Sequence, residues 1–146
     1  MTRMLDTANS QPNEPSDDLS DGLVLPVPIQ SYFDALNQKD FFQAAALFSQ
    51  QGQLIPPFEK PIEGREAIAH YLATEASEMT LMPISYKPQN GPENADLQSF
   101  KVEGKVKHTL FVVNVAWQFD ITTNNKIESV QIKLLASLQE LLKVKR

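Results

Sequence analysis

"SFKVEGKVKHTLFVVNVAWQFDI", residues 99–121, alternates apolar and polar side chains with a period of two. In its first half Phe100, Val102 and Val106 alternate with charged residues. In its second half a longer apolar set shares one face: Phe111, Val113, Val115, Trp117, Phe119 and Ile121. This period is typical of strands with one face in the core and the other in water. We therefore predict two long antiparallel strands here.

The segments on either side extend the same pattern. "MTLMPISY" (79–86) alternates weakly, with Met79 and Leu81 on one side, and "IESVQIKLL" (127–135) reads as the last strand after the turn "TTNNK". Upstream, "GQLIPPF" (52–58) predicts a short strand that two prolines interrupt. The second half of the chain therefore predicts a sheet.

The first half has the period of helices instead. In "PIQSYFDALNQKD" (28–40), Ile29, Phe33 and Leu36 recur at helical spacing, and Tyr32 lies at the edge of this apolar stripe. Asp40 is a plausible N-cap for a second helix, whose apolar stripe is Phe41, Ala44, Ala45 and Phe48.

A third helix is predicted in "EGREAIAHYLATEA" (63–76), where Ile68, Tyr71 and Leu72 share a face. Helices first and antiparallel strands afterwards is the α+β pattern, a curved sheet wrapped around helices. Residues 1–25 read as a disordered acidic leader and residues 26–146 as the folded domain. Ser137 and Glu140 form a capping box that predicts a short tail helix.

Composition excludes several classes of function. The chain has no cysteine, which rules out disulfides and thiolate chemistry, and its net charge of −5 argues against a nucleic-acid surface. The sequence contains neither a long apolar span nor the apolar region of a signal peptide, so the expected location is the cytoplasm.

Candidate catalytic groups are few. His70 and His108 lie in no recognisable nucleophile or metal motif, and structural or solvated roles suit both. Carboxylate pairs such as Glu63 with Glu66, or Glu75 with Glu78, are typical of solvated helix faces. We therefore predict no catalytic or metal site.

A binding cavity is better supported. A curved sheet against helices leaves an apolar cavity at its mouth, where a few polar groups orient a ligand. Tyr32 and Trp117 carry the polar tips nearest to such a cavity. Both rings could equally fill the core and bond to backbone or water, so the residues alone leave the two interpretations open.

Five stretches together resemble the C-terminal domain of the cyanobacterial orange carotenoid protein and its free-standing homologues: "YFDALNQKDFFQAAALF", "LIPPFEKPIEGREAIAHYL", "LMP", "VAWQF" and "LLASLQELL". The resemblance runs from about Pro28 to the C-terminus. It implies the cone-shaped nuclear transport factor 2-like fold. It also implies a ketocarotenoid of echinenone or canthaxanthin type, whose ring oxygen accepts hydrogen bonds from Tyr32 and Trp117. The implied pocket lining is Leu36, Met79, Leu81, Val113 and Val115.

The chain also departs from this family. No helical carotenoid domain precedes the resemblance, so we expect no complete photoactive switch within this chain. The segment "KHTLFVV" (107–113) is shorter than in the full-length proteins, and Ala76 stands where relatives carry a cysteine on the third helix. Thiol control of a dimer is therefore not expected.

The resemblance implies a water-soluble carrier that takes carotenoid from membranes by transient contact, delivers it to helical carotenoid proteins and quenches singlet oxygen. Because a forty-carbon pigment is about as long as such a domain is wide, we expect a homodimer that shares one carotenoid.

Two alternative functions remain. The fold also hosts small isomerases and hydrolases, which need a buried base, although Pro56 and Pro57 stand near the place of their catalytic acid. The tail helix could also serve a protein-interaction domain.

Overall fold

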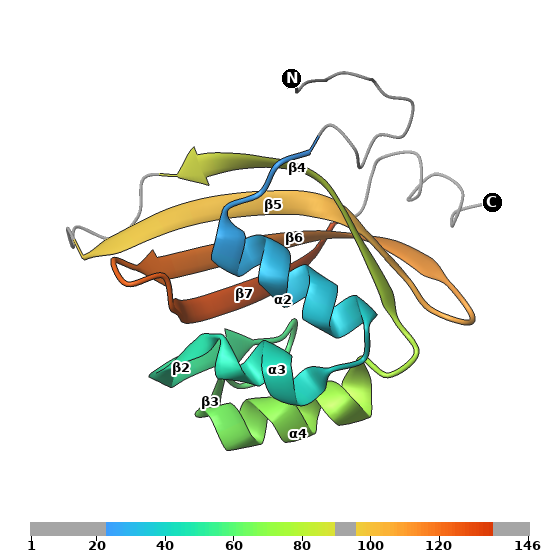
Figure 1. Cartoon of the computed structure of the whole chain (residues 1–146). Coiled ribbons are helices and arrows are strands. Elements are labelled where there is room, and N and C mark those ends of the chain that lie inside the picture. Colours follow the sequence, from blue (N-terminus) through green and yellow to red (C-terminus); the bar gives the residue numbers. More distant parts are fainter. Residues whose placement is uncertain (1–22, 90–95, 136–146) are drawn as a thin grey trace, which may run out of the picture.

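Three helices cover one face of a curved six-stranded sheet in the computed structural model, which describes residues 23–89 and 96–135 (Figure 1). The elements in chain order are α2 (Val27–Asn37), α3 (Phe41–Ala46), β2 (Phe48–Ile55), β3 (Ile62–Glu63), α4 (Arg65–Glu75), β4 (Thr80–Gln89), β5 (Leu97–Lys107), β6 (Val112–Thr122) and β7 (Ile127–Leu135). The α+β architecture predicted from the two periodicities is confirmed.

The sheet has the order β3-β2-β7-β6-β5-β4. Strand β2 runs parallel to β7, and the other pairs are antiparallel. Opposite Trp117 of β6 lie Val102 on β5 and Ile132 on β7. The register therefore puts the apolar side chains of the segment 99–121 on the face of the sheet that the helices cover, as their alternation predicts.

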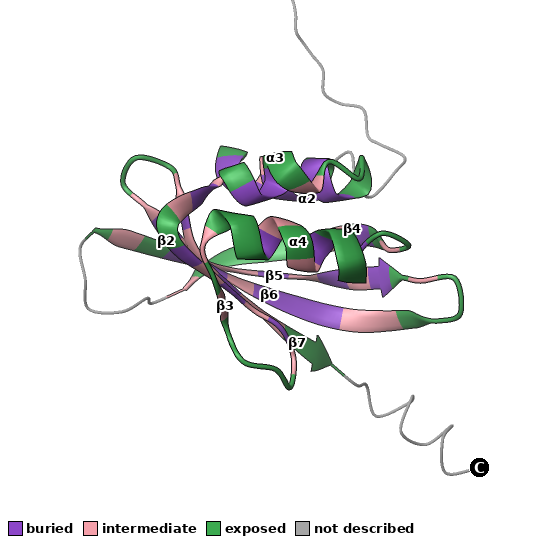
Figure 2. Ribbon diagram, turned by 90° about the horizontal axis from the view of Figure 1, so that it is seen from below, coloured by how far each residue is buried: buried purple, intermediate pink, exposed green. Residues whose placement is uncertain are grey.

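The core lies between the helices and this face (Figure 2). Tyr32 and Phe33 of α2 meet Phe119 of β6 edge to face, with ring centroids 5.4 and 5.9 Å away, and Phe33 meets Trp117 at 4.8 Å. Edge-to-face contacts suit the charge distribution of aromatic rings. The aromatic cluster fastens α2 to the middle of the sheet.

The helix ends follow local chemistry. Asp40 caps α3, because its side chain accepts a hydrogen bond from the backbone N–H of Gln43 at 3.1 Å. Pro28 lies in the first turn of α2, where its missing N–H costs nothing. Helix α4 starts after Gly64, whose φ of 92° favours glycine.

Some boundaries differ from the sequence predictions. Helix α3 ends at Ala46, and Phe48 belongs to β2, where it pairs with Ile127 of β7. The helical stripe assigned to Phe48 was therefore wrong, since sheet pairing outcompetes a short helix there. Strand β2 begins four residues before "GQLIPPF", and Phe111 precedes β6.

Two predictions fall on other parts of the chain. The leader, apart from its last residues, and the tail helix at Ser137 to Glu140 lie outside the described residues. At the start of the described part, Leu25 is buried and Leu23 packs against the core. Within the described ranges no helix is long and apolar enough to cross a membrane.

Candidate functional site

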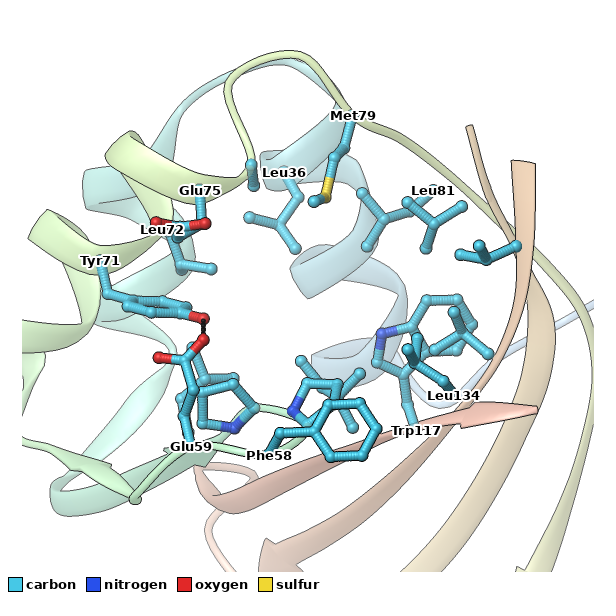
Figure 3. Close-up of a pocket in the computed structure, with 18 of the residues that line it drawn as sticks. Leu36, Phe58, Glu59, Tyr71, Leu72, Glu75, Met79, Leu81, Trp117 and Leu134 are labelled. Carbon is cyan, nitrogen blue, oxygen red and sulfur yellow. Dashed lines mark hydrogen bonds between the residues drawn. The ribbon is translucent and has the colours of Figure 1, made fainter. Parts of the chain in front are cut away.

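A cavity of about 490 Å³ opens between the helices and the sheet (Figure 3). Its wall is formed by α2, the end of β2, the β2–β3 connection, α4 and strands β4 to β7. Most of the lining is apolar: Leu36, Leu54, Pro56, Pro57, Phe58, Leu72, Ala76, Met79, Leu81, Val106, Phe111, Val113, Val115, Ile132 and Leu134. Such a volume and lining suit a small apolar ligand or part of a larger one.

All seven residues singled out from the sequence line this one cavity: Tyr32, Leu36, Met79, Leu81, Val113, Val115 and Trp117. Tyr32 and Leu36 lie one helical turn apart on α2, so they face the same way. The β6 residues Val113, Val115 and Trp117 alternate with outward residues and share the inner face. The periodicities of helix and strand thus converge on the cavity from opposite sides.

Tyr32 and Trp117 are each only 1% exposed. Neither the Tyr32 hydroxyl nor the Trp117 indole N–H has a hydrogen-bond partner among the described residues. Figure 3 shows the indole nitrogen on the side of the ring that faces the open space. Buried polar groups are normally paired, so two unpaired donors in one apolar cavity need an explanation.

The two groups also suit an acceptor chemically. Burial, followed by the nearby Tyr71, raises the pKa of the Tyr32 hydroxyl above its ordinary value. The phenol therefore stays protonated and can donate, and an indole N–H can only donate. The cavity is thus equipped for a neutral oxygen on an apolar molecule.

Asn37 and Lys39 hold the wall formed by Met79 and Leu81. The Asn37 side-chain amide donates to the Leu81 carbonyl at 2.9 Å and accepts from the Leu81 N–H at 2.8 Å. The Lys39 ammonium donates to the carbonyls of Met79 and Ala76. These bonds tie the end of α2 to the start of β4, and so keep Tyr32 in a fixed relation to the β4 wall.

The polar groups at the opening include a hydrogen-bonded pair. The Tyr71 hydroxyl donates to a Glu59 carboxylate oxygen at 3.1 Å (Figure 3). Burial, this hydrogen bond and the charges of Glu59 and Glu75 raise the pKa of Tyr71. Both carboxylates are exposed, and no Asp or Glu in the described ranges is buried. The buried base that the isomerase or hydrolase hypothesis requires is therefore not found beside Tyr32 in the part described.

The sequence analysis missed several lining residues. Phe58, Tyr71 and Leu134 come from three separate segments and enclose the opening. The Pro56–Pro57 pair was a usable signal, because β2 ends at Ile55 and the following turn runs along the cavity. No sequence pattern marks Leu134 as a lining residue, since its exposure depends on where β7 ends.

Neither His70 nor His108 lines the cavity. His70 is exposed on α4, and His108 stacks on Phe111 with ring centroids 4.8 Å apart. No group of three or more His, Asp or Glu side chains in the described segments could hold a metal ion.

Comparison with known proteins agrees with this geometry. The family model of the nuclear transport factor 2 (NTF2) domain matches residues 28–137 of this chain. The chain is 36% identical to the orange carotenoid-binding protein of Limnospira maxima over 78% of its own length, and 35% identical to that of Synechocystis over 81%. It spans 37% and 38% of these two relatives, and the similarity is to their C-terminal domain.

A solved structure gives the same result. The Orange Carotenoid Protein of Anabaena, in a structure binding canthaxanthin, superposes with a TM-score of 0.72 at 31% identity. The match covers 94% of this chain and 46% of that one.

Proposed function

This chain belongs to the nuclear transport factor 2 domain family, and from its cavity we propose that it is a water-soluble carrier of a ketocarotenoid. The observation that carries the proposal is the pair of buried donors, Tyr32 and Trp117, which have no partner among the described residues and lie in a mostly apolar cavity. A keto group on a terminal ring is a neutral acceptor on an apolar body, and it fits this arrangement.

The energetics divide between two contributions. Burial of the ring contributes about 25 cal/mol for each Å² of apolar surface and dominates affinity. Each hydrogen bond to the keto oxygen adds only about 0.5 to 1.5 kcal/mol. The two donors therefore orient the ring and draw electron density toward the oxygen, which moves the absorption of the polyene to longer wavelength.

The relatives support this class of ligand. Two of them are named as orange carotenoid-binding proteins, and one solved structure holds canthaxanthin. Because the chain spans about two fifths of the curated relatives, what the whole proteins do reaches this chain only as a proposal. On that basis the carrier takes pigment from membranes, passes it to helical carotenoid proteins and quenches singlet oxygen through the bound polyene.

Pigment uptake tests the proposal directly. Apo-protein is mixed with canthaxanthin-bearing vesicles, or with canthaxanthin in detergent, and the absorption spectrum of the soluble fraction is recorded. We expect a soluble complex whose band is shifted to the red. Tyr32→Phe and Trp117→Phe should each move the band back toward that of the free pigment.

Tyr71→Phe is the matched control. It removes the same hydroxyl from a tyrosine of the same cavity, but at the opening, where the hydroxyl already has Glu59 as its partner. The band should not move in this variant. If no complex forms from either source, carotenoid binding is wrong, and if Tyr71→Phe moves the band as far as Tyr32→Phe, the donor assignment is wrong.

A further inference from the structure

Five large apolar side chains are exposed on residues that line the cavity or that adjoin a lining residue in the chain: Phe58, Leu110, Phe111, Val112 and Leu134. Phe58, Phe111 and Leu134 line the cavity, and Leu110 and Val112 flank Phe111 in the chain. Phe58 is 93% exposed and Leu110 84%. These five residues are called the apolar rim below. Apolar side chains that gather around an opening mark a contact site, whereas scattered ones do not.

One side of the apolar rim is a braced hairpin tip between β5 and β6. The His108 N–H donates to the Phe111 carbonyl at 2.8 Å, and the two rings stack. The Thr109 hydroxyl donates to a Glu78 carboxylate oxygen at 3.0 Å, which ties the tip to the segment after α4. Leu110 therefore projects from a tip that is held in place.

Phe58 forms the other side from a strained turn. Its φ is 63°, in the left-handed region that bulky residues rarely adopt. No packing accounts for this conformation, because the ring is almost fully exposed. Strain that persists at an exposed aromatic residue points to a functional role for that residue.

Charge is distributed unevenly around the opening. From Gly104 to Phe119 the chain carries Lys105 and Lys107 but no Asp or Glu. Lys107 pairs with Val112 of the apolar rim across β5 and β6, and the exposed Lys133 precedes Leu134. Glu59 and Glu75 line the cavity from the β2–β3 connection and α4, and Glu78 contacts the hairpin tip at Thr109 and His108. The hairpin thus has an apolar tip with one carboxylate beside it, and exposed lysines follow in the adjoining strands.

We propose that the apolar rim is a membrane-docking surface for a bilayer that contains anionic lipid. The tips of Leu110 and Phe58 enter the headgroup region, as apolar side chains of interfacial proteins do, while Lys107 and Lys133 lie at the level of the headgroup charges. This proposal rests on the proposed function for its purpose: a pigment that leaves the bilayer through a docked opening never crosses water.

Co-sedimentation with pigment-free vesicles tests the docking. The apo-protein should bind vesicles of phosphatidylcholine with phosphatidylglycerol, bind those of phosphatidylcholine alone more weakly, and dissociate as salt rises. Leu110→Ser should lower the partition coefficient by about tenfold or more, because it removes a large inserted side chain. Phe42→Ser is the matched control, since Phe42 is 81% exposed on α3 and should have no effect.

A charge-reversal variant tests the contribution of the lysines to docking. Lys107→Glu should weaken binding to the anionic vesicles and leave binding to the neutral ones unchanged. Lys87→Glu reverses an exposed charge near the other end of β4 and should change neither.

Three results would overturn the docking proposal: no binding of the wild type to either vesicle, equal effects of Leu110→Ser and Phe42→Ser, or an apo-dimer that Leu110→Ser separates while vesicles are ignored. The last result would make the apolar rim a face between two copies. Because these vesicles hold no pigment, the outcome is independent of carotenoid binding, which the detergent-delivered canthaxanthin tests by itself.

Discussion

At the scale of single residues, Tyr32 and Trp117 are deeply buried, and within the part of the chain that the structure describes their donors have no partner. Their rings pack against Phe33, so both contribute to the core. Their polar atoms contribute nothing to it among the described residues. In the proposed function the ring contributes to stability and the polar atom binds the ligand, and for this reason periodicity alone could not decide between the two roles.

This division predicts an unusual effect on stability. Tyr32→Phe removes a buried hydroxyl that has no partner among the described residues, so the free energy of unfolding should stay unchanged or rise by up to about 1 kcal/mol. Urea unfolding of the pigment-free protein measures it. Phe33→Leu, which removes a ring that touches Tyr32 and Trp117, should lose more than about 1 kcal/mol by comparison. A similar loss in Tyr32→Phe would mean that the hydroxyl is bonded in the free protein.

The raised pKa of Tyr32 predicts a pH dependence. Above the ordinary pKa of 10.0 the unfolded chain releases the phenol proton, whereas the folded chain keeps it. The unfolded state then binds fewer protons, and stability falls by up to about 1.4 kcal/mol per pH unit from this residue. Below that pH, Tyr32 has no effect on the slope. Urea midpoints between pH 9 and 11, taken as wild type minus Tyr32→Phe, isolate the effect from the lysines, and parallel curves would contradict it.

At the scale of elements, β4 is shaped by one glycine on its neighbour. Strand β4 has a register irregularity between Pro83 and Ser85, opposite Gly104 of β5. A Cβ on Gly104 would lie 2.1 Å from the Met82 carbonyl oxygen and 2.8 Å from the Pro83 Cα. The two strands meet there so closely that only glycine fits, and this contact shapes the β4 wall of the cavity.

Gly104→Ala should therefore destabilise the protein. The clash is with backbone, which cannot rotate away, so we expect a loss of about 2 to 3 kcal/mol in the free energy of unfolding, toward the upper end for overpacking. Thermal or urea unfolding measures it. Ala116→Gly, on the opposite face of the neighbouring strand, serves as a reference for the intrinsic difference between the two residues. A loss no larger than that of the reference would show that β4 can shift.

At the scale of the whole molecule, size limits what one chain can enclose. A domain of about 120 residues has a radius of gyration near 14 Å, and a forty-carbon pigment is about as long as such a domain is wide. The opening of the cavity leads to solvent past the apolar rim. If the proposed function holds, we expect one chain to enclose one end of the pigment and a second protein to cover the other.

A diketo pigment should therefore bind two chains. Canthaxanthin has a keto ring at each end, so we expect one pigment per two protomers, with the two openings facing each other about a two-fold axis. Sedimentation velocity, followed at 280 nm and in the pigment band, measures the stoichiometry. The apo-protein is the control for pigment dependence. A one-to-one complex at saturating protein would contradict the shared pigment.

The periodicities predicted most of the fold. The strands of residues 99–121 bury the expected face because a half-buried strand must alternate, and Asp40 and Gly64 precede their helices for local reasons. The boundary at Phe48 was wrong because it depends on a parallel pairing with Ile127, seventy-nine residues away in the chain. No local pattern contains such a pairing.

The candidate site divides in the same way. By itself the sequence determined which residue types face inward, because side-chain direction follows from helix and strand period. Tyr32 and Trp117, and the five residues that the family resemblance added, all line the cavity. Only the tertiary structure decided that the donors of Tyr32 and Trp117 have no partner among the described residues, that Gly104 lies against the backbone of β4, and that Phe58 and Leu110 are exposed. Those features depend on contacts between segments distant in the chain, and on the space where packing stops.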